Sequence, residues 1–240
     1  MQPRTGLARA LSKLGHCSRS QAVVLVREGR VQLNGRVRRD PETPVRLGSD
    51  TVTVNDAPVT TVERVYLMLN KPRGLVTTAT DELGRDTVYT CFQGTTLPHL
   101  PAVGRLDKAS EGLLLFTNDN AWANAITDPA THLDKTYHVQ VAVLADDDLL
   151  RRLTQGVIED DERLAVKRAT ILRHGEKNSW LEIVLDEGKN RHIRRLLDAF
   201  EIEVLRLVRV AIGPLALGDL TKGQWRKLTT SEVQALHHNS

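Results

Sequence analysis

Residues 104–119 read GRLDKASEGLLLFTND and place a charged turn directly before an apolar run. The run from Leu113 to Phe116 is short, continuous and bounded, which predicts a strand buried on both faces. The turn before it carries Asp107, and a carboxylate directly before a buried strand is held by a rigid element. Asp107 is therefore the first candidate for chemistry, although an Asp in an isolated turn more often bonds its own backbone.

The whole stretch resembles the active-site motif of the pseudouridine synthases, in the branch named for ribosomal small subunit pseudouridine synthase A. That motif is GRLD followed by T/S-x-G-L-L-L-x-T-N/D-D-G, and this chain departs from it at Asn120, where Gly is usual. The resemblance implies that Asp107 is the catalytic residue. It also implies that Arg105 occupies the space left by a target base that has flipped out of its stack.

Further stretches match the same family in the same order along the chain. The sequence NKPRG before LVTT, residues 70–78, is similar to its first motif and makes Lys71 a candidate phosphate contact, with a surface turn residue as the alternative. The sequence KTY opens a predicted strand, where Tyr137 offers a flat face for stacking on uracil. The sequence EGKNRHIRRLL, residues 187–197, resembles the third motif, in which Arg194 matches the arginine that pairs with the catalytic Asp.

The helix within this third motif predicts two additional RNA contacts. Its apolar residues share one face, which leaves Arg191 and Arg195 on the opposite side and Arg194 on the flank. Near the C-terminal end, G-x-W-R-x-L resembles the closing pattern of the family. Leu207, in the predicted strand of residues 204–210, aligns with an apolar residue of the family that packs on the target base.

The first sixty residues predict a compact unit of two helices and a few strands. Apolar residues recur at helical spacing in residues 7–14, a capping-box pattern begins a second helix at residues 19–28, and Asn34-Gly35 indicates a hairpin. The segment resembles the S4 RNA-binding domain. On matching positions, the predicted contacts with folded RNA are Arg4, Arg19, Arg27, Arg30 and Arg36, with Lys13 as a further candidate.

Charge is unevenly distributed along the 240 residues. The net charge is +3, but residues 1–62 hold ten Lys and Arg against five Asp and Glu, so that this segment alone carries +5. A basic front segment suggests a polyanionic partner. A solvated basic surface is also common, so charge alone does not establish RNA binding.

Composition and motifs limit the remaining possibilities. With 40% apolar and 26% charged residues the chain has an ordinary globular composition. It has no apolar run long enough to span a bilayer and no signal-peptide core at the N-terminus, so we expect a cytoplasmic protein. Cys17 and Cys91 suggest neither a disulfide framework nor a zinc site, His237 and His238 lie in an expected tail, and no nucleotide-binding or metal-binding spacing occurs. We expect no cofactor, no metal and a monomer.

The predicted architecture is α+β in two domains. Residues 1–62 form the S4-like domain, and residues 63–240 form a catalytic domain built on a mixed, mainly antiparallel sheet with flanking helices. Its expected strands are residues 65–69, 75–78, 113–116, 135–143, 180–185 and 204–210, and its expected helices include residues 121–126.

The resulting hypothesis is an isomerase that converts one uridine of ribosomal RNA to pseudouridine, with small and large subunit RNA both open. Asp107, Tyr137 and Arg194 are the predicted catalytic set. One alternative is a non-catalytic RNA-binding or ribosome-assembly protein on the same fold. The other is a sugar hydrolase that uses Asp107 and Glu111 as its pair of carboxylates, which the 4% aromatic content makes weak.

Overall fold

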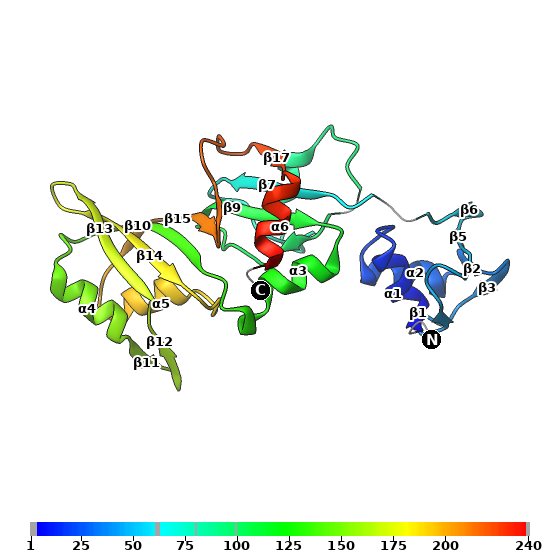
Figure 1. The fold of residues 1–240 in the computed structure, drawn as a ribbon, viewed down its shortest axis with the longest axis horizontal. Helices are drawn as coiled ribbons and strands as arrows, with labels where there is room; N and C mark the ends of the chain where they lie inside the picture. Colours follow the sequence, from blue (N-terminus) through cyan, green and yellow to red (C-terminus); the bar gives the residue numbers. More distant parts are fainter. Residues whose placement is uncertain (1–3, 61–62, 80, 99, 239–240) are drawn as a thin grey trace. The chain divides into compact units, whose positions relative to one another are not determined.

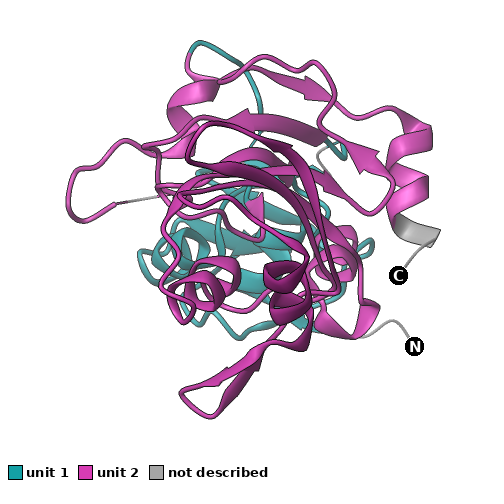
Figure 2. Ribbon diagram, turned by 90° about the vertical axis from the view of Figure 1, so that its left-hand side faces the viewer, with its two compact units in different colours: residues 1–65, 94–101, 117–120 teal, residues 66–93, 102–116, 121–240 magenta. Residues whose placement is uncertain are grey.

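The computed structural model describes residues 4–60, 63–79, 81–98 and 100–238. The chain forms two compact units, coloured separately in Figure 2. The first comprises residues 1–65, 94–101 and 117–120, and the second comprises residues 66–93, 102–116 and 121–240. The domain boundary expected after residue 62 falls at a gap in the described residues and stays a prediction.

Two short helices form the core of the first unit. Helix α1 (Leu7–Lys13) buries its apolar face, and α2 (Arg19–Arg27) begins with the expected capping box. Ser18 Oγ accepts from the backbone N–H of Gln21 at 3.2 Å, while Gln21 Oε1 accepts from the backbone N–H of Ser18 at 3.0 Å. Both predicted helices are therefore confirmed.

Small sheets complete the first unit. A four-stranded sheet has the order β3-β2-β5-β6, and β1 pairs with β4. Asn34 and Gly35 both have positive φ, 52° and 74°, which is the type I′ hairpin turn expected of Asn-Gly. The strands are β1 (Thr5–Gly6), β2 (Val31–Leu33), β3 (Arg36–Arg38), β4 (Pro44–Val45), β5 (Val52–Val54) and β6 (Ala57–Pro58).

A nine-stranded mixed sheet organises the second unit. Its main path is β13-β14-β10-β15-β9-β7-β17, with β16 added to β15 and β8 added to β9. Strand β15 runs parallel to β9 and antiparallel to β10. The strands are β7 (Tyr66–Lys71), β8 (Ala102–Val103), β9 (Glu111–Thr117), β10 (Lys135–Val141), β13 (Arg168–His174), β14 (Ser179–Leu185), β15 (Val204–Ile212), β16 (Leu215–Ala216) and β17 (Trp225–Lys227).

Helices pack on this sheet in two separate clusters. Helices α4 (Asp147–Gln155) and α5 (His192–Asp198) pack with the inward side chains of β10, β14 and β15. Helices α3 (Asn120–Thr127) and α6 (Thr230–His238) pack instead on β7 and β9, as Figure 1 shows. The α+β class is confirmed, and every residue of β9 is buried as its apolar run predicted.

Several local predictions were wrong. Residues 75–78 form no strand but only an isolated bridge between Val76 and Thr87, next to a short 3-10 helix, Val88–Phe92. A small hairpin of β11 (Val157–Glu159) and β12 (Glu162–Leu164) was missed, because the residues at its turn are all charged. The backbone of His237 and His238 belongs to α6 and not to a tail.

None of the helices in the described part of the chain has the length and apolar composition that a bilayer crossing requires. Cys17 and Cys91 are free thiols. Within the same residues, no group of three or more His, Cys, Asp or Glu side chains is arranged to hold a metal ion.

Candidate active site

Asp107 lies in a tight loop immediately before β9. Its side chain is partly buried, and its backbone carbonyl accepts from the N–H of Ser110 at 2.9 Å. The loop of residues 107–110 then leads into a strand that is buried throughout. Asp107 thus lies directly before the buried strand β9, as the sequence predicted.

Lys71, at the end of β7, holds this loop from within the protein. Its side chain is fully buried, and Nζ donates to the carbonyls of Asp107 at 3.1 Å, Ser110 at 2.8 Å and Pro72 at 3.2 Å. This placement contradicts the prediction that Lys71 contacts phosphate, because the ammonium is out of reach of RNA. Burial lowers the pKa of Lys71 to about 8, despite the opposing charge of Asp107.

Arg194 approaches the same loop from α5. Its Nη2 donates to the carbonyl of Ala109 at 3.2 Å, whereas its buried Nε has no hydrogen-bond partner within the described chain. Among those residues no ion pair within 4.0 Å joins Arg194 to Asp107, so the direct pair expected from the sequence is not formed here. Burial and the nearby Arg191 lower the pKa of Arg194, while the charge of Asp107 raises it.

The register of the sheet brings Tyr137 toward the Asp107 loop. Tyr137 on β10 lies opposite Arg209 on β15, and Arg209 lies opposite Gly112 on β9. Two strand spacings, about 10 Å, therefore separate the backbone of Tyr137 from the start of β9. This row of residues joins two motifs that are distant in the sequence.

Two residues of β15 lie close to this row. Leu207, opposite Val139, is 7% exposed and belongs to the core against which Tyr137 packs. Arg209 is buried, its Nε donates to the carbonyl of Leu113 at 2.8 Å, and its Nη2 has no hydrogen-bond partner in the described residues. Sequence reasoning missed Arg209, because in the sequence it is one of two arginines within an otherwise apolar strand.

The carboxylate of Glu111 is buried and is paired with two partly exposed cations. Arg206 binds both of its carboxylate oxygens, at 3.0 and 3.1 Å, and Lys222 pairs with it as well. Burial pushes the pKa of Glu111 upward, but these hydrogen bonds outweigh burial and the pKa is lowered. A carboxylate so firmly paired is not the second catalytic acid that a sugar hydrolase would need.

Of the other arginines predicted to contact RNA in the second unit, two are exposed and one is paired with protein carboxylates. Arg105 and Arg191 are exposed. Arg195 instead donates to Glu159 and Glu162, at 2.6 Å each, and links α5 to the β11–β12 hairpin. Arg195 is therefore paired with protein carboxylates, and its contact with RNA stays a prediction.

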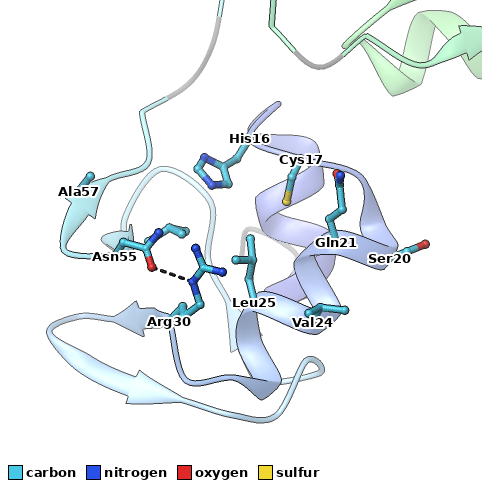
Figure 3. A pocket seen from close by; sticks show the side chains of 10 residues that line it. His16, Cys17, Ser20, Gln21, Val24, Leu25, Arg30, Asn55 and Ala57 are labelled. Carbon is cyan, nitrogen blue, oxygen red and sulfur yellow. Dashed lines mark hydrogen bonds between the residues drawn. The ribbon is translucent and has the colours of Figure 1, made fainter. Parts of the chain in front are cut away.

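In the first unit all the predicted RNA contacts are exposed: Arg4, Arg19, Arg27, Arg30 and Arg36, together with Lys13. Arg30 lies at an open pocket of about 890 Å³, shown in Figure 3. Its guanidinium donates to Asn55 Oδ1 at 2.9 Å, and Val24 and Leu25 supply apolar lining. The pocket thus combines the guanidinium of Arg30 with hydrogen-bonding and apolar groups.

Residues 65–199, more than half of the chain, match the family model of the RNA pseudouridylate synthases. The chain belongs to this family. Residues 5–52 match the S4 domain, so the synthase binds RNA through an N-terminal S4 domain.

The sequences of relatives match the synthase over nearly its full length. It is 36% identical over 232 residues to ribosomal large subunit pseudouridine synthase B of Bacillus subtilis (strain 168), covering 96% of this chain and 94% of the relative. The Yersinia pestis protein of the same name is 33% identical, covering 92% of this chain and 72% of the relative. A crystal structure of a pseudouridylate synthase is similar with a TM-score of 0.68 and 29% identity, covering 97% and 99% of the two chains.

Membership in this family settles the reaction class. The synthase is an isomerase of RNA uridines, and the readings as a binding-only protein or a sugar hydrolase are set aside.

Proposed function

We propose that the synthase converts a uridine of large-subunit ribosomal RNA to pseudouridine, with Asp107 as the catalytic residue. Two relatives whose names specify the large ribosomal subunit support this choice of substrate. The motif of residues 104–119 supports a place in the branch named for ribosomal small subunit pseudouridine synthase A. We also infer that the synthase acts on its RNA in the cytoplasm.

The observation that carries the catalytic role is the placement of Asp107. The carboxylate lies on a loop that Lys71 and Arg194 fix through backbone carbonyls, at the entrance to a buried strand. Pseudouridine formation breaks the bond between N1 and the ribose C1′, turns the base, and joins C5 to the same carbon. An ionised carboxylate beside the sugar serves either attack on C1′ or removal of a sugar proton.

The remaining residues have supporting roles in this proposal. The target uridine leaves its stack, at a cost of a few kcal/mol, and Arg105 fills the vacated space. Tyr137 stacks on the uracil with Leu207 packed beside it. Arg194 already donates to the carbonyl of Ala109, two residues after Asp107. Active-site hydrogen bonds commonly tighten only when substrate binds. Arg194 then pairs with the Asp107 carboxylate and keeps it ionised.

Carbodiimide mapping of pseudouridine tests the proposal. Both large ribosomal RNAs are mapped from cells that have and lack the synthase, and from cells with only the Asp107→Asn form. We expect one modified uridine of the large-subunit RNA to disappear without the synthase and not to return with Asp107→Asn. Restoration of the modification by the Asn form would rule out Asp107 as the catalytic residue.

The same variant separates chemistry from binding. Asp107→Asn changes one oxygen to an amide nitrogen and keeps the side-chain size, so we expect RNA affinity to be nearly unchanged while turnover is lost. A modified site in small-subunit RNA instead would keep the role of Asp107 and overturn the proposed substrate.

A further inference from the structure

Two segments hold the loop that carries Asp107. The turn after β7 does so through the N–H of Gly74, which donates to the carbonyl of Lys108 at 2.8 Å. Helix α5 does so through Arg194 Nη2, which donates to the carbonyl of Ala109 at 3.2 Å. Side chains on these two segments are therefore positioned relative to Asp107 by direct hydrogen bonds.

Each of the two segments carries an exposed arginine. Arg73 is exposed and lies in the tight turn between Pro72 and Gly74, where the φ of +100° at Gly74 suits a glycine. Arg191 is the N-cap residue of α5. Within the described residues neither guanidinium makes a hydrogen bond or an ion pair with the protein.

The two arginines add positive charge to a site that already contains Arg194. The charges of both Arg191 and Arg73 act on Arg194 and lower its pKa in addition to burial, whereas Asp107 is the one carboxylate that acts in the opposite direction. Arg73 and Arg191 thus lie near enough to Arg194 for their like charges to repel its guanidinium, and an anionic ligand would relieve that repulsion.

We propose that Arg73 and Arg191 form an arginine pair that binds phosphate groups of the RNA backbone beside the flipped uridine. Arg73, and not Lys71, is then the phosphate contact of the NKPRG turn. A guanidinium presents a planar fork that matches phosphate in two parallel hydrogen bonds. A nucleotide held outside its stack needs its backbone fixed, since the base has lost its neighbours. The inference rests on the proposed role of Asp107.

The test compares three variants of the full chain. Arg73→Gln and Arg191→Gln each remove one cation, and Lys177→Gln removes an exposed cation in the turn before β14, at the opposite end of that strand from Arg191. Binding to polyuridylic acid is measured from low to moderate salt. We expect each arginine variant to reduce the slope of log affinity against log salt by about 0.7, and the control to leave it unchanged.

Steady-state kinetics on the ribosomal RNA substrate provide the second readout. We expect KM to rise roughly tenfold for each arginine variant, as for loss of a charged hydrogen bond, with kcat nearly unchanged. Arg73→Lys keeps the charge, so it should retain the salt slope while losing part of the affinity. Thermal unfolding of every variant excludes misfolding.

Unchanged salt slopes for both arginine variants would overturn the proposed phosphate-binding pair. A fall in kcat at unchanged KM would also overturn it, because these residues would then position Asp107 instead. Absence of turnover by the unmodified synthase on large-subunit RNA would count against the proposed substrate. The polyuridylic acid slopes would still decide the pair in that case, because they need no specific site.

Discussion

A buried lysine is unusual in proteins unless it is paired. Within the described residues no carboxylate forms an ion pair with Lys71, and three backbone carbonyls stabilise its ammonium instead. Two of those carbonyls, of Asp107 and Ser110, belong to the loop of residues 107–110 that carries the proposed catalytic carboxylate. The residue that looked like a surface contact in the sequence is therefore an internal support of the active site. Its protonation state should matter to the chemistry.

Activity is expected to fall as pH rises above about 8, the pKa to which burial lowers Lys71. A neutral amine has two N–H bonds instead of three, so one carbonyl loses its donor and the Asp107 loop loosens. The folded pKa is below the ordinary value of 10.5, so between these two values the unfolded chain binds more protons and this group adds stability as pH rises. The loss should therefore appear in kcat and not in the free energy of unfolding.

A pH profile of kcat together with urea unfolding at the same pH values checks this prediction. Lys71→Met removes all three hydrogen bonds and should lower kcat roughly 100-fold even at neutral pH, as expected for a misplaced catalytic group. A Lys71→Met variant that folds and keeps full activity would show that the loop does not depend on this lysine.

At the scale of secondary-structure elements, the parallel pairing of β9 with β15 links the motif around Asp107 to Tyr137 and Leu207. The close approach of these strands needs Gly112. Its φ is +101°, and a Cβ built there would lie 2.2 Å from the carbonyl oxygen of Arg209. The positive φ and the close approach of strand β15 thus explain why the motif has glycine at position 112.

Gly112→Ala is expected to destabilise the protein by roughly 2–4 kcal/mol, since it adds both backbone strain and a clash with main-chain atoms. The two strands would have to separate, so activity should fall as well. Denaturant unfolding measures the effect. Gly188→Ala is the matched control, because no atom lies within 4 Å of a Cβ there, and its stability should change by less than about 0.5 kcal/mol.

At the scale of the whole molecule, basic charge is concentrated in the first 62 residues, where the S4 domain lies. The exposed arginines of that domain are the expected contacts with folded RNA. The two units each have their own hydrophobic core, so affinity and chemistry can be altered separately.

The double variant Arg19→Gln/Arg36→Gln should weaken RNA binding and reduce the salt slope by about 2, one for each phosphate contact. Arg9→Gln/Arg46→Gln removes the same charge from exposed positions of the same domain that the S4 resemblance does not select. Filter binding at several salt concentrations compares the two. Equal slopes for both double variants would mean that the domain contributes only diffuse charge.

The sequence by itself determined the elements that depend on neighbouring residues. Helices α1 and α2, the Asn34-Gly35 turn and buried strand β9 follow from periodicity, capping and turn chemistry, all of which act over a few residues. The strand expected at residues 75–78 is absent, because a short stretch rich in β-branched residues does not reveal whether a partner strand lies beside it. The order of four motifs along the chain was also enough to indicate the family.

Only the tertiary structure decided the environment of the site residues. Lys71 meets Ser110 across 39 positions of the chain, Arg194 meets Ala109 across 85, and Arg206 meets Glu111 across 95. No local pattern encodes such contacts, since they depend on which strands pair and which helix face is covered. That is why the sequence could name Lys71 and Arg195 as cations near the site, whereas the burial of Lys71 and the ion pairs of Arg195 are set by the tertiary structure.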